Sequence, residues 1–213
     1  MGVQERRERE KQARQDAILE AAQEIFFAKG LDQATIDEVA ERAELSKGAI
    51  YLYFKSKEEL YISVLLKGLD ILIMQLREVK AHPRGKSAGE IIREMKEMYY
   101  HFFKKYPEYF YIHSLLYHGR VKKKVAPSIW KATHQKVWDA LQIVAEIIQS
   151  GIDAGTFRNM DCWKAANSFW GSATGVMMML DDSELQDIVA IPVKEQLDDT
   201  IELLIDSLSQ HKN

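Results

Sequence analysis

The chain is 213 residues long, 46% hydrophobic and 29% charged, with a formal net charge of −3 at pH 7. This composition excludes a disordered chain and predicts a globular protein of one large or two small domains. The negative balance does not suit a nucleic-acid-binding chain taken whole. Residues 1–57, with ten lysines and arginines against eleven aspartates and glutamates, are also slightly acidic. Any contact with DNA must therefore come from a small basic patch.

The single cysteine and the N-terminal sequence indicate the cellular compartment in which we expect the protein. With Cys162 alone, an intramolecular disulfide is excluded and a reducing environment is expected. The first fourteen residues alternate arginine, lysine and glutamate without the apolar core of a signal peptide. No stretch is apolar enough for a membrane-spanning helix, so we expect a cytoplasmic protein with no membrane partner.

The N-terminal region is expected to begin with a frayed, mixed-charge arm over residues 2–12. A first firm helix should follow over residues 12–29, with Gly30 as its C-terminal stop. Its apolar residues are spaced to face a core, which gives this helix a bracing role.

A helix-turn-helix pattern follows the first helix. Thr35 and Glu38 form a capping box that predicts the start of one short helix at Thr35. Ser46 can cap a second short helix that begins at Lys47. Because a helix of this kind fits the major groove of B-DNA, the pattern predicts a DNA-reading unit.

The residues around the second helix suit contact with DNA. Small residues allow close approach, tyrosines offer hydroxyls and flat rings, and three lysines fall within residues 47–57 with no acidic residue between them. An ordinary helical hairpin with half-buried tyrosines is the alternative. The candidate DNA-binding residues are Thr35, Ser46, Lys47, Gly48, Ala49, Tyr51, Tyr53, Lys55 and Lys57.

Residues 35–60 fit the pattern T-x-x-x-V-A-x-x-A-x-x-S-x-G-x-x-Y-x-Y-F-x-x-K-x-x-L, which resembles the TetR family of bacterial transcription regulators. The resemblance covers roughly the first 65 residues, and Glu44-Leu45 departs from the Gly-Val usual in the turn. It implies an all-α protein with a three-helix helix-turn-helix DNA-binding head, residues 1–57. A larger helical effector-binding and dimerisation domain, residues 58–213, would follow.

The rest of the chain is predicted to be helical. A long connecting helix should span residues 57–79, and the proline, glycine and charges of residues 81–86 mark a break. Further helices are expected over residues 88–106, 108–118, 128–152, 161–180 and 193–208.

The second half of the chain is dense in aromatic residues and methionines, which suit a malleable, mostly apolar ligand cavity. A plain hydrophobic core is the alternative for each of these side chains. The resemblance likewise implies an effector site here, for a small hydrophobic molecule. The candidate ligand-binding residues are Tyr99, Phe103, Tyr106, Tyr117, Trp138, Trp170 and Met178.

Other chemistry finds little support in the sequence. His101, His113 and His118 lack the spacing of a zinc site, and Cys162 has no histidine near it in the sequence. No phosphate loop and no nucleophile–base motif is present. We therefore expect neither enzymatic activity nor a catalytic residue, metal or cofactor.

The last two helices are expected to form a homodimer interface. Residues 171–175 are small and permit close helix approach, although packing within one chain is the alternative. The final helix carries an apolar stripe of Val193, Leu197, Ile201, Leu204, Ile205 and Leu208. A twofold dimer would match a palindromic operator in double-stranded DNA.

The function expected from these features is a ligand-responsive transcriptional regulator. It would be a repressor released from a palindromic operator when an apolar, aromatic or acyl-type effector binds. The alternative is a helical small-molecule binding protein whose N-terminal head contacts protein instead of DNA.

Overall fold

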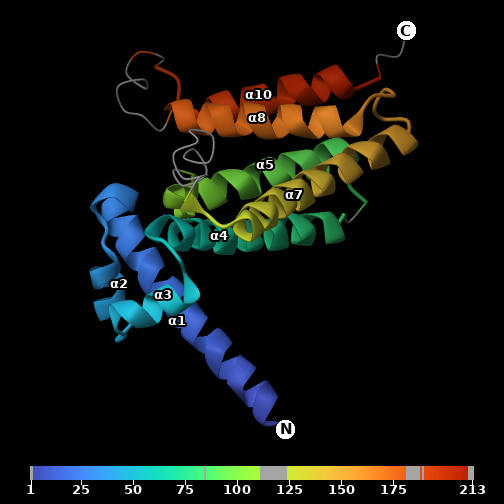
Figure 1. Cartoon of the computed structure of the whole chain (residues 1–213). Helices are drawn as coiled ribbons and strands as arrows, with labels where there is room; N and C mark the ends of the chain where they lie inside the picture. Colours follow the sequence, from blue (N-terminus) through green and yellow to red (C-terminus); the bar gives the residue numbers. More distant parts are fainter. Residues whose placement is uncertain (1, 84, 111–123, 181–187, 189, 211–213) are drawn as a thin grey trace. The chain divides into compact units, whose positions relative to one another are not determined.

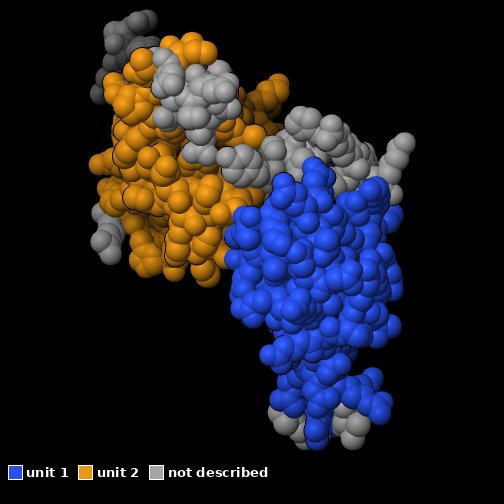
Figure 2. All heavy atoms as spheres, turned by 90° about the vertical axis from the view of Figure 1, so that its left-hand side faces the viewer, with its two compact units in different colours: residues 1–68, 111–134 blue, residues 69–110, 135–213 orange. Residues whose placement is uncertain are grey.

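The computed structural model describes residues 2–83, 85–110, 124–180, 188 and 190–210. The chain forms two compact units, coloured separately in Figure 2. Unit 1 comprises residues 1–68 and 111–134, and unit 2 comprises residues 69–110 and 135–213. In the described ranges the regular structure is helical, apart from one isolated antiparallel bridge between Phe157 and Ser209. The expected all-α class is confirmed.

Helix α1, Val3–Gln33, begins much earlier than the sequence predicts. The expectation of a frayed arm over residues 2–12 is wrong, because side chains one turn apart support the helix there. One such pair joins Arg6 and Glu10 at 2.8 Å. Among the described side chains of α1, Ile18 is the first that is buried. At Gly30 the backbone leaves the helical conformation, with φ 70°, as expected for a stop signal.

Helices α2, Ile36–Arg42, and α3, Lys47–Tyr53, form the predicted helix-turn-helix. Both predicted caps are present: Thr35 accepts from the Glu38 amide, and Ser46 accepts from the Ala49 amide. Helix α2 packs against α1, and α3 packs against α2 (Figure 1).

Helix α4, Lys57–Ala81, is continuous and contributes residues to both units. Its residues up to Gly68 belong to unit 1, and those from Leu69 belong to unit 2. Ser56 caps its first turn by accepting from the Glu59 amide at 3.0 Å.

Unit 2 is a bundle in which α8 and α10 lie side by side (Figure 1) and α5 packs against both. The α10 residues Leu197, Ile201, Ile205 and Leu208 are buried in this bundle. The last part of the expected helix over residues 108–118 lies outside the described residues. The bounds of the remaining helices are Ala88–Lys105 for α5, Pro127–Asp153 for α7, Cys162–Leu180 for α8 and Val193–Leu208 for α10.

The turn between α7 and α8 is bound to the end of α10. The Arg158 amide donates to Leu208 O at 2.8 Å, and the Gln210 amide donates to Thr156 O at 3.2 Å. The Phe157 ring lies so close to Gly151 that a Cβ on this glycine would stand 2.4 Å from it. The C-terminal end of α10 is thus held by the backbone of this turn.

Candidate nucleic-acid interface

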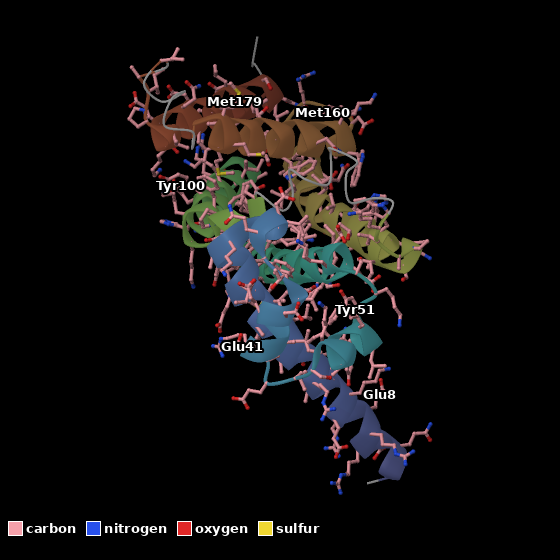
Figure 3. The ribbon with its side chains drawn as sticks, turned by 60° about the vertical axis from the view of Figure 1, so that its left-hand side comes forward. Glu8, Glu41, Tyr51, Tyr100, Met160 and Met179 are labelled. Carbon is pink, nitrogen blue, oxygen red and sulfur yellow. The ribbon has the colours of Figure 1, made fainter. Side chains whose placement is uncertain are left out.

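Helix α3 buries one face in unit 1 and exposes the other. Ile50 is completely buried, and Phe54, directly after the helix, is 2% exposed. Away from this face, Tyr51 and Leu52 are 39% and 77% exposed; Figure 3 labels Tyr51 on this helix. The inner residues hold the helix in place, so the outer face is available to a partner.

The first turn of α3 is flat on its outer side. Gly48 is exposed, and a Cβ built on it would meet only Ser46 Oγ, at 3.9 Å. Ala49 and Tyr53 are half-buried at the edges of this face. A partner can therefore approach the backbone of the first turn closely.

The two lysines at the ends of α3 differ in their surroundings. The Lys47 ammonium lies 2.8 Å from a carboxylate oxygen of Asp37 on α2, and this hydrogen bond raises the pKa of Lys47. Lys55 is exposed and forms no ion pair with any residue that the structure describes. An anion arriving at Lys47 would have to replace Asp37, whereas Lys55 is free to receive one.

Lys57 is occupied within unit 1. Its ammonium donates to Ala34 O at 2.9 Å and to Asp32 O at 3.4 Å. These carbonyls lie at the end of α1 and in the link to α2, where a positive charge is favourable. Lys57 thus connects the start of α4 to the entry of the helix-turn-helix.

Thr35 and Ser46 also serve the scaffold through their capping bonds. The carboxylate of Glu38 receives bonds from Lys29 and from the amide and hydroxyl of Thr35. Together they lower the pKa of Glu38 to about 2, the Lys29 bond contributing most. Among the nine candidates, the structure groups Lys47, Gly48, Tyr51 and Lys55 on the exposed side.

Unit 2 brings several candidate effector residues together. The rings of Phe103 and Phe110 meet edge to face at 5.0 Å between centroids, and Tyr99 lies 5.3 Å from Phe110. The Tyr99 hydroxyl lies 2.9 Å from the hydroxyl of Thr174 on α8. Burial raises the pKa of nearby Tyr109 to about 12, which indicates apolar surroundings.

The other candidate effector residues are spread over unit 2. Tyr106 ends α5 with its ring 5.4 Å from Phe102. Trp138 is 48% exposed and lies 5.8 Å from Trp163, while Trp170 is half-buried. Met178 is exposed on α8, and Tyr117 lies outside the described residues.

Comparison with known proteins identifies the family. Residues 18–64 match the family model described as "Bacterial regulatory proteins, tetR family". The regulator FadR of Bacillus subtilis, solved with stearoyl-CoA, superposes with a TM-score of 0.69 over 90% of this chain and 98% of its own, at 18% identity. Residues 18–64 of the chain therefore belong to the TetR family.

Curated relatives match part of this chain. The uncharacterized regulator YfiR of Bacillus subtilis is 39% identical over 72 residues, which are 34% of this chain and 35% of YfiR. The activator FasR of Mycolicibacterium smegmatis is 42% identical over 65 residues, 30% of each chain. The chain therefore matches about a third of the length of these relatives.

The turn between α2 and α3 contains Glu44 and Leu45, where the resemblance led us to expect glycine and valine. Glu44 occupies a left-handed conformation with φ 54°, which glycine adopts without cost. The Leu45 amide still donates to Ala40 O at 2.9 Å, so the turn closes with a side chain at the strained position.

Helices α8 and α10, which the sequence predicts to form the dimer interface, each have a buried face and an exposed face. Much of the α10 apolar stripe packs inside the chain, as the intramolecular alternative supposes. On the outer side, a Cβ on Gly171 or Gly175 of α8 would meet no atom within 4 Å. Met179 of α8, labelled in Figure 3, and Leu203 of α10 are also exposed.

The remaining candidates carry no visible chemistry. Within the described ranges, no group of three or more histidine, cysteine or acidic side chains could hold a metal ion. Burial raises the pKa of the Cys162 thiol, which disfavours the reactive thiolate. His101 is exposed, whereas His113 and His118 lie outside the described part. A search of the described helices finds none long and apolar enough to cross a membrane.

Proposed function

We propose that this TetR-family protein is a ligand-responsive regulator of transcription that represses by binding a palindromic operator through α3. A small apolar, aromatic or acyl-type effector would release it. The observation that carries this proposal is the outer face of α3, where Gly48, Tyr51 and Lys55 are exposed on a helix held firmly from behind. Such a face fits the major groove and its flanking phosphates.

Operator recognition on this proposal requires two copies of the chain. One seven-residue helix contacts few base pairs, so a twofold dimer with two α3 helices about 34 Å apart would read a palindrome. The outer face of α8 and α10 supports such a dimer. Gly171 and Gly175 leave room on α8 for a partner helix, and Leu203 of α10 is 70% exposed.

The effector site is proposed to lie in unit 2. The aromatic cluster around Phe110 is largely apolar, and Oε1 of Gln75 on α4 is buried with no hydrogen-bond partner among the described residues. An unpaired buried acceptor suits a ligand that carries a donor group. The likeness in fold to FadR, solved with stearoyl-CoA, supports an acyl compound as the first effector to test.

Release on this proposal works through α4. Its first turn is tied to the helix-turn-helix by Lys57 and to residue 124 by Ser56, whose hydroxyl donates to Lys124 O at 2.8 Å. Because α4 is one continuous helix, an effector that shifts its C-terminal part would also shift its start. A few ångström of change between two α3 helices would then prevent simultaneous contact with both half-sites.

Selection of bound sequences from a random duplex pool tests the DNA-binding step. We expect a palindrome whose binding weakens steeply with salt, since phosphate contacts release counterions. No enrichment at low salt would refute the proposal and favour a head that contacts protein.

The release step has its own test. Stearoyl-CoA would be titrated into the protein with and without the selected operator. The operator should weaken the binding of stearoyl-CoA by the same factor by which stearoyl-CoA weakens the binding of the operator. Equal affinities in the two titrations would refute release by this effector while leaving DNA binding intact.

A further inference from the structure

Leu52 is a large apolar side chain placed where the fold gives it nothing to pack on. It is 77% exposed near the end of α3, although Ile50 and Phe54 on either side of it in sequence are buried. Because residues two apart on a helix point in different directions, the packing that anchors α3 necessarily turns Leu52 outward. It was not among the DNA-binding residues predicted from the sequence.

The surroundings of Leu52 on α3 give it a clear approach to a partner. Gly48 lies one turn earlier on the same side and presents no side chain, with open space above it. The outer face is thus flat at its start and carries one projecting isobutyl group at its end. The positive charge of Lys55 follows directly after the helix.

We propose that Leu52 recognises a thymine by packing its δ-methyl groups against the C5 methyl group in the major groove. The inference rests on the proposed DNA-binding function and adds a specificity-determining residue to it. Thymine is the one base that presents a methyl group in this groove, and leucine has no hydrogen-bonding group with which to read any other edge. A nucleic acid fits this face better than a protein does, because Lys55 beside it is exposed and forms no ion pair with any residue that the structure describes.

The contact would discriminate by burial alone. Removing one methyl group from the interface forfeits about the free energy of burying one CH₂, which corresponds to roughly a fourfold change in affinity per half-site. Cytosine at the same position would in addition place its amino group against the leucine without a partner.

The experiment uses the full-length protein and the operator recovered by selection. Each thymine is replaced in turn by deoxyuridine, which pairs identically but lacks the methyl group. With the wild-type protein, replacing that thymine in one half-site should weaken binding about fourfold, and replacing it in both half-sites should weaken binding about sixteenfold. Leu52→Ala should bind the thymine and deoxyuridine duplexes equally at that position, while Leu52→Met, which keeps an apolar side chain of similar reach, should retain the preference.

Met74→Ala serves as the matched control. It truncates another exposed apolar side chain, on α4, and should leave the thymine preference intact. Because Leu52 packs on nothing in unit 1, its substitution should leave the circular dichroism and melting temperature unchanged.

The outcomes separate this inference from the function on which it rests. If the selection yields no enriched sequence, DNA binding itself is refuted, and this contact with it. If an operator is recovered but no thymine responds to loss of its methyl group, or if Leu52→Ala keeps the full preference, the contact is refuted while DNA binding stands.

Discussion

Two arginine–glutamate pairs of the same geometry hold the two units in different ways. In unit 1, Arg42 forms two hydrogen bonds with Glu24, 18 residues away in sequence. In unit 2, Arg93 forms two hydrogen bonds with Glu202, 109 residues away. The first pair closes a short segment, whereas the second joins α5 to the last helix.

The difference extends to other contacts of the helix-turn-helix and of unit 2. In the head, Lys47 pairs with Asp37 across 10 residues. In unit 2, the hydroxyls of Tyr99 and Thr174 meet across 75 residues. Short loops cost less entropy to close, so the reading head is defined largely by its own stretch of chain. The bundle requires residues from both ends of its sequence.

The largest effect is expected at Gly151, in the long-range packing of unit 2. Alanine there would place its Cβ 2.4 Å from the Phe157 ring and 2.8 Å from the Ala88 Cβ. Overpacking of this kind should lower the free energy of unfolding by about 1–3 kcal/mol, measured by urea titration. In a Phe157→Ala background the same substitution should cost less. An equal cost in both backgrounds would show that the ring is not the obstacle.

The next-largest effect distinguishes Lys57, which stabilises unit 1, from Lys55, which is proposed to contact DNA phosphates. Lys57→Met removes a charged donor from two carbonyls and should destabilise the protein by about 1 kcal/mol. The slope of operator affinity against salt should stay unchanged. Lys55→Met should do the reverse: stability within about 0.5 kcal/mol of wild type, and a slope reduced by about one per subunit. A reduced slope in Lys57→Met would return that lysine to the phosphate contacts.

A smaller effect should appear on acidification, from the bond between α5 and α10. The hydrogen bond from Arg93 lowers the pKa of Glu202 below its ordinary 4.5. Because the folded pKa lies below the unfolded one, the stabilisation is present above about pH 4.5 and is lost as the pH falls through the folded pKa. Both side chains are over 40% exposed, so Glu202→Gln should cost less than about 1 kcal/mol at pH 7.

Urea titrations from pH 7 to pH 3 would measure this dependence. The difference between wild type and Glu202→Gln should shrink below pH 4.5, and Arg93→Met should remove the same dependence. A difference that is constant across this range would show that the pair contributes nothing through ionisation.

The smallest effect concerns the turn of the head. Glycine in place of Glu44 would relieve the left-handed conformation, at φ 54°, but would gain freedom in the unfolded chain. These opposing terms leave an expected gain of about 0.5 kcal/mol, seen as a higher melting temperature. Glu44→Ala should give no gain, and a stabilised alanine variant would point to charge as the cause.

The fold of the head was predictable because its signals are local. The caps at Thr35 and Ser46 and the stop at Gly30 lie within three residues of the backbone groups or bends that they fix. The division of α3 into a buried and an exposed face follows from the same short pattern. Leu52 could have been found this way, since it falls between the buried Ile50 and Phe54.

The roles of individual side chains were harder to predict where a partner lies far off in sequence. Nothing in the stretch around Lys57 indicates that its ammonium meets carbonyls of residues 32 and 34. The α10 stripe could be predicted as apolar, but whether it faces the same chain or a second copy depends on the packing of α5 and α8. The helical start of α1 was missed because fully exposed charged residues carry no apolar period.

The pairing of Lys47 with Asp37 has a consequence for how the protein would search a genome. On any DNA, the ammonium gives up a carboxylate before it gains a phosphate, so the net electrostatic gain from that contact is small. Binding to random sequence, which depends on phosphates alone, is weakened, and the protein spends less time on the millions of wrong sites. Asp37 on α2 would thus lower the affinity for DNA and speed dissociation from non-specific sites.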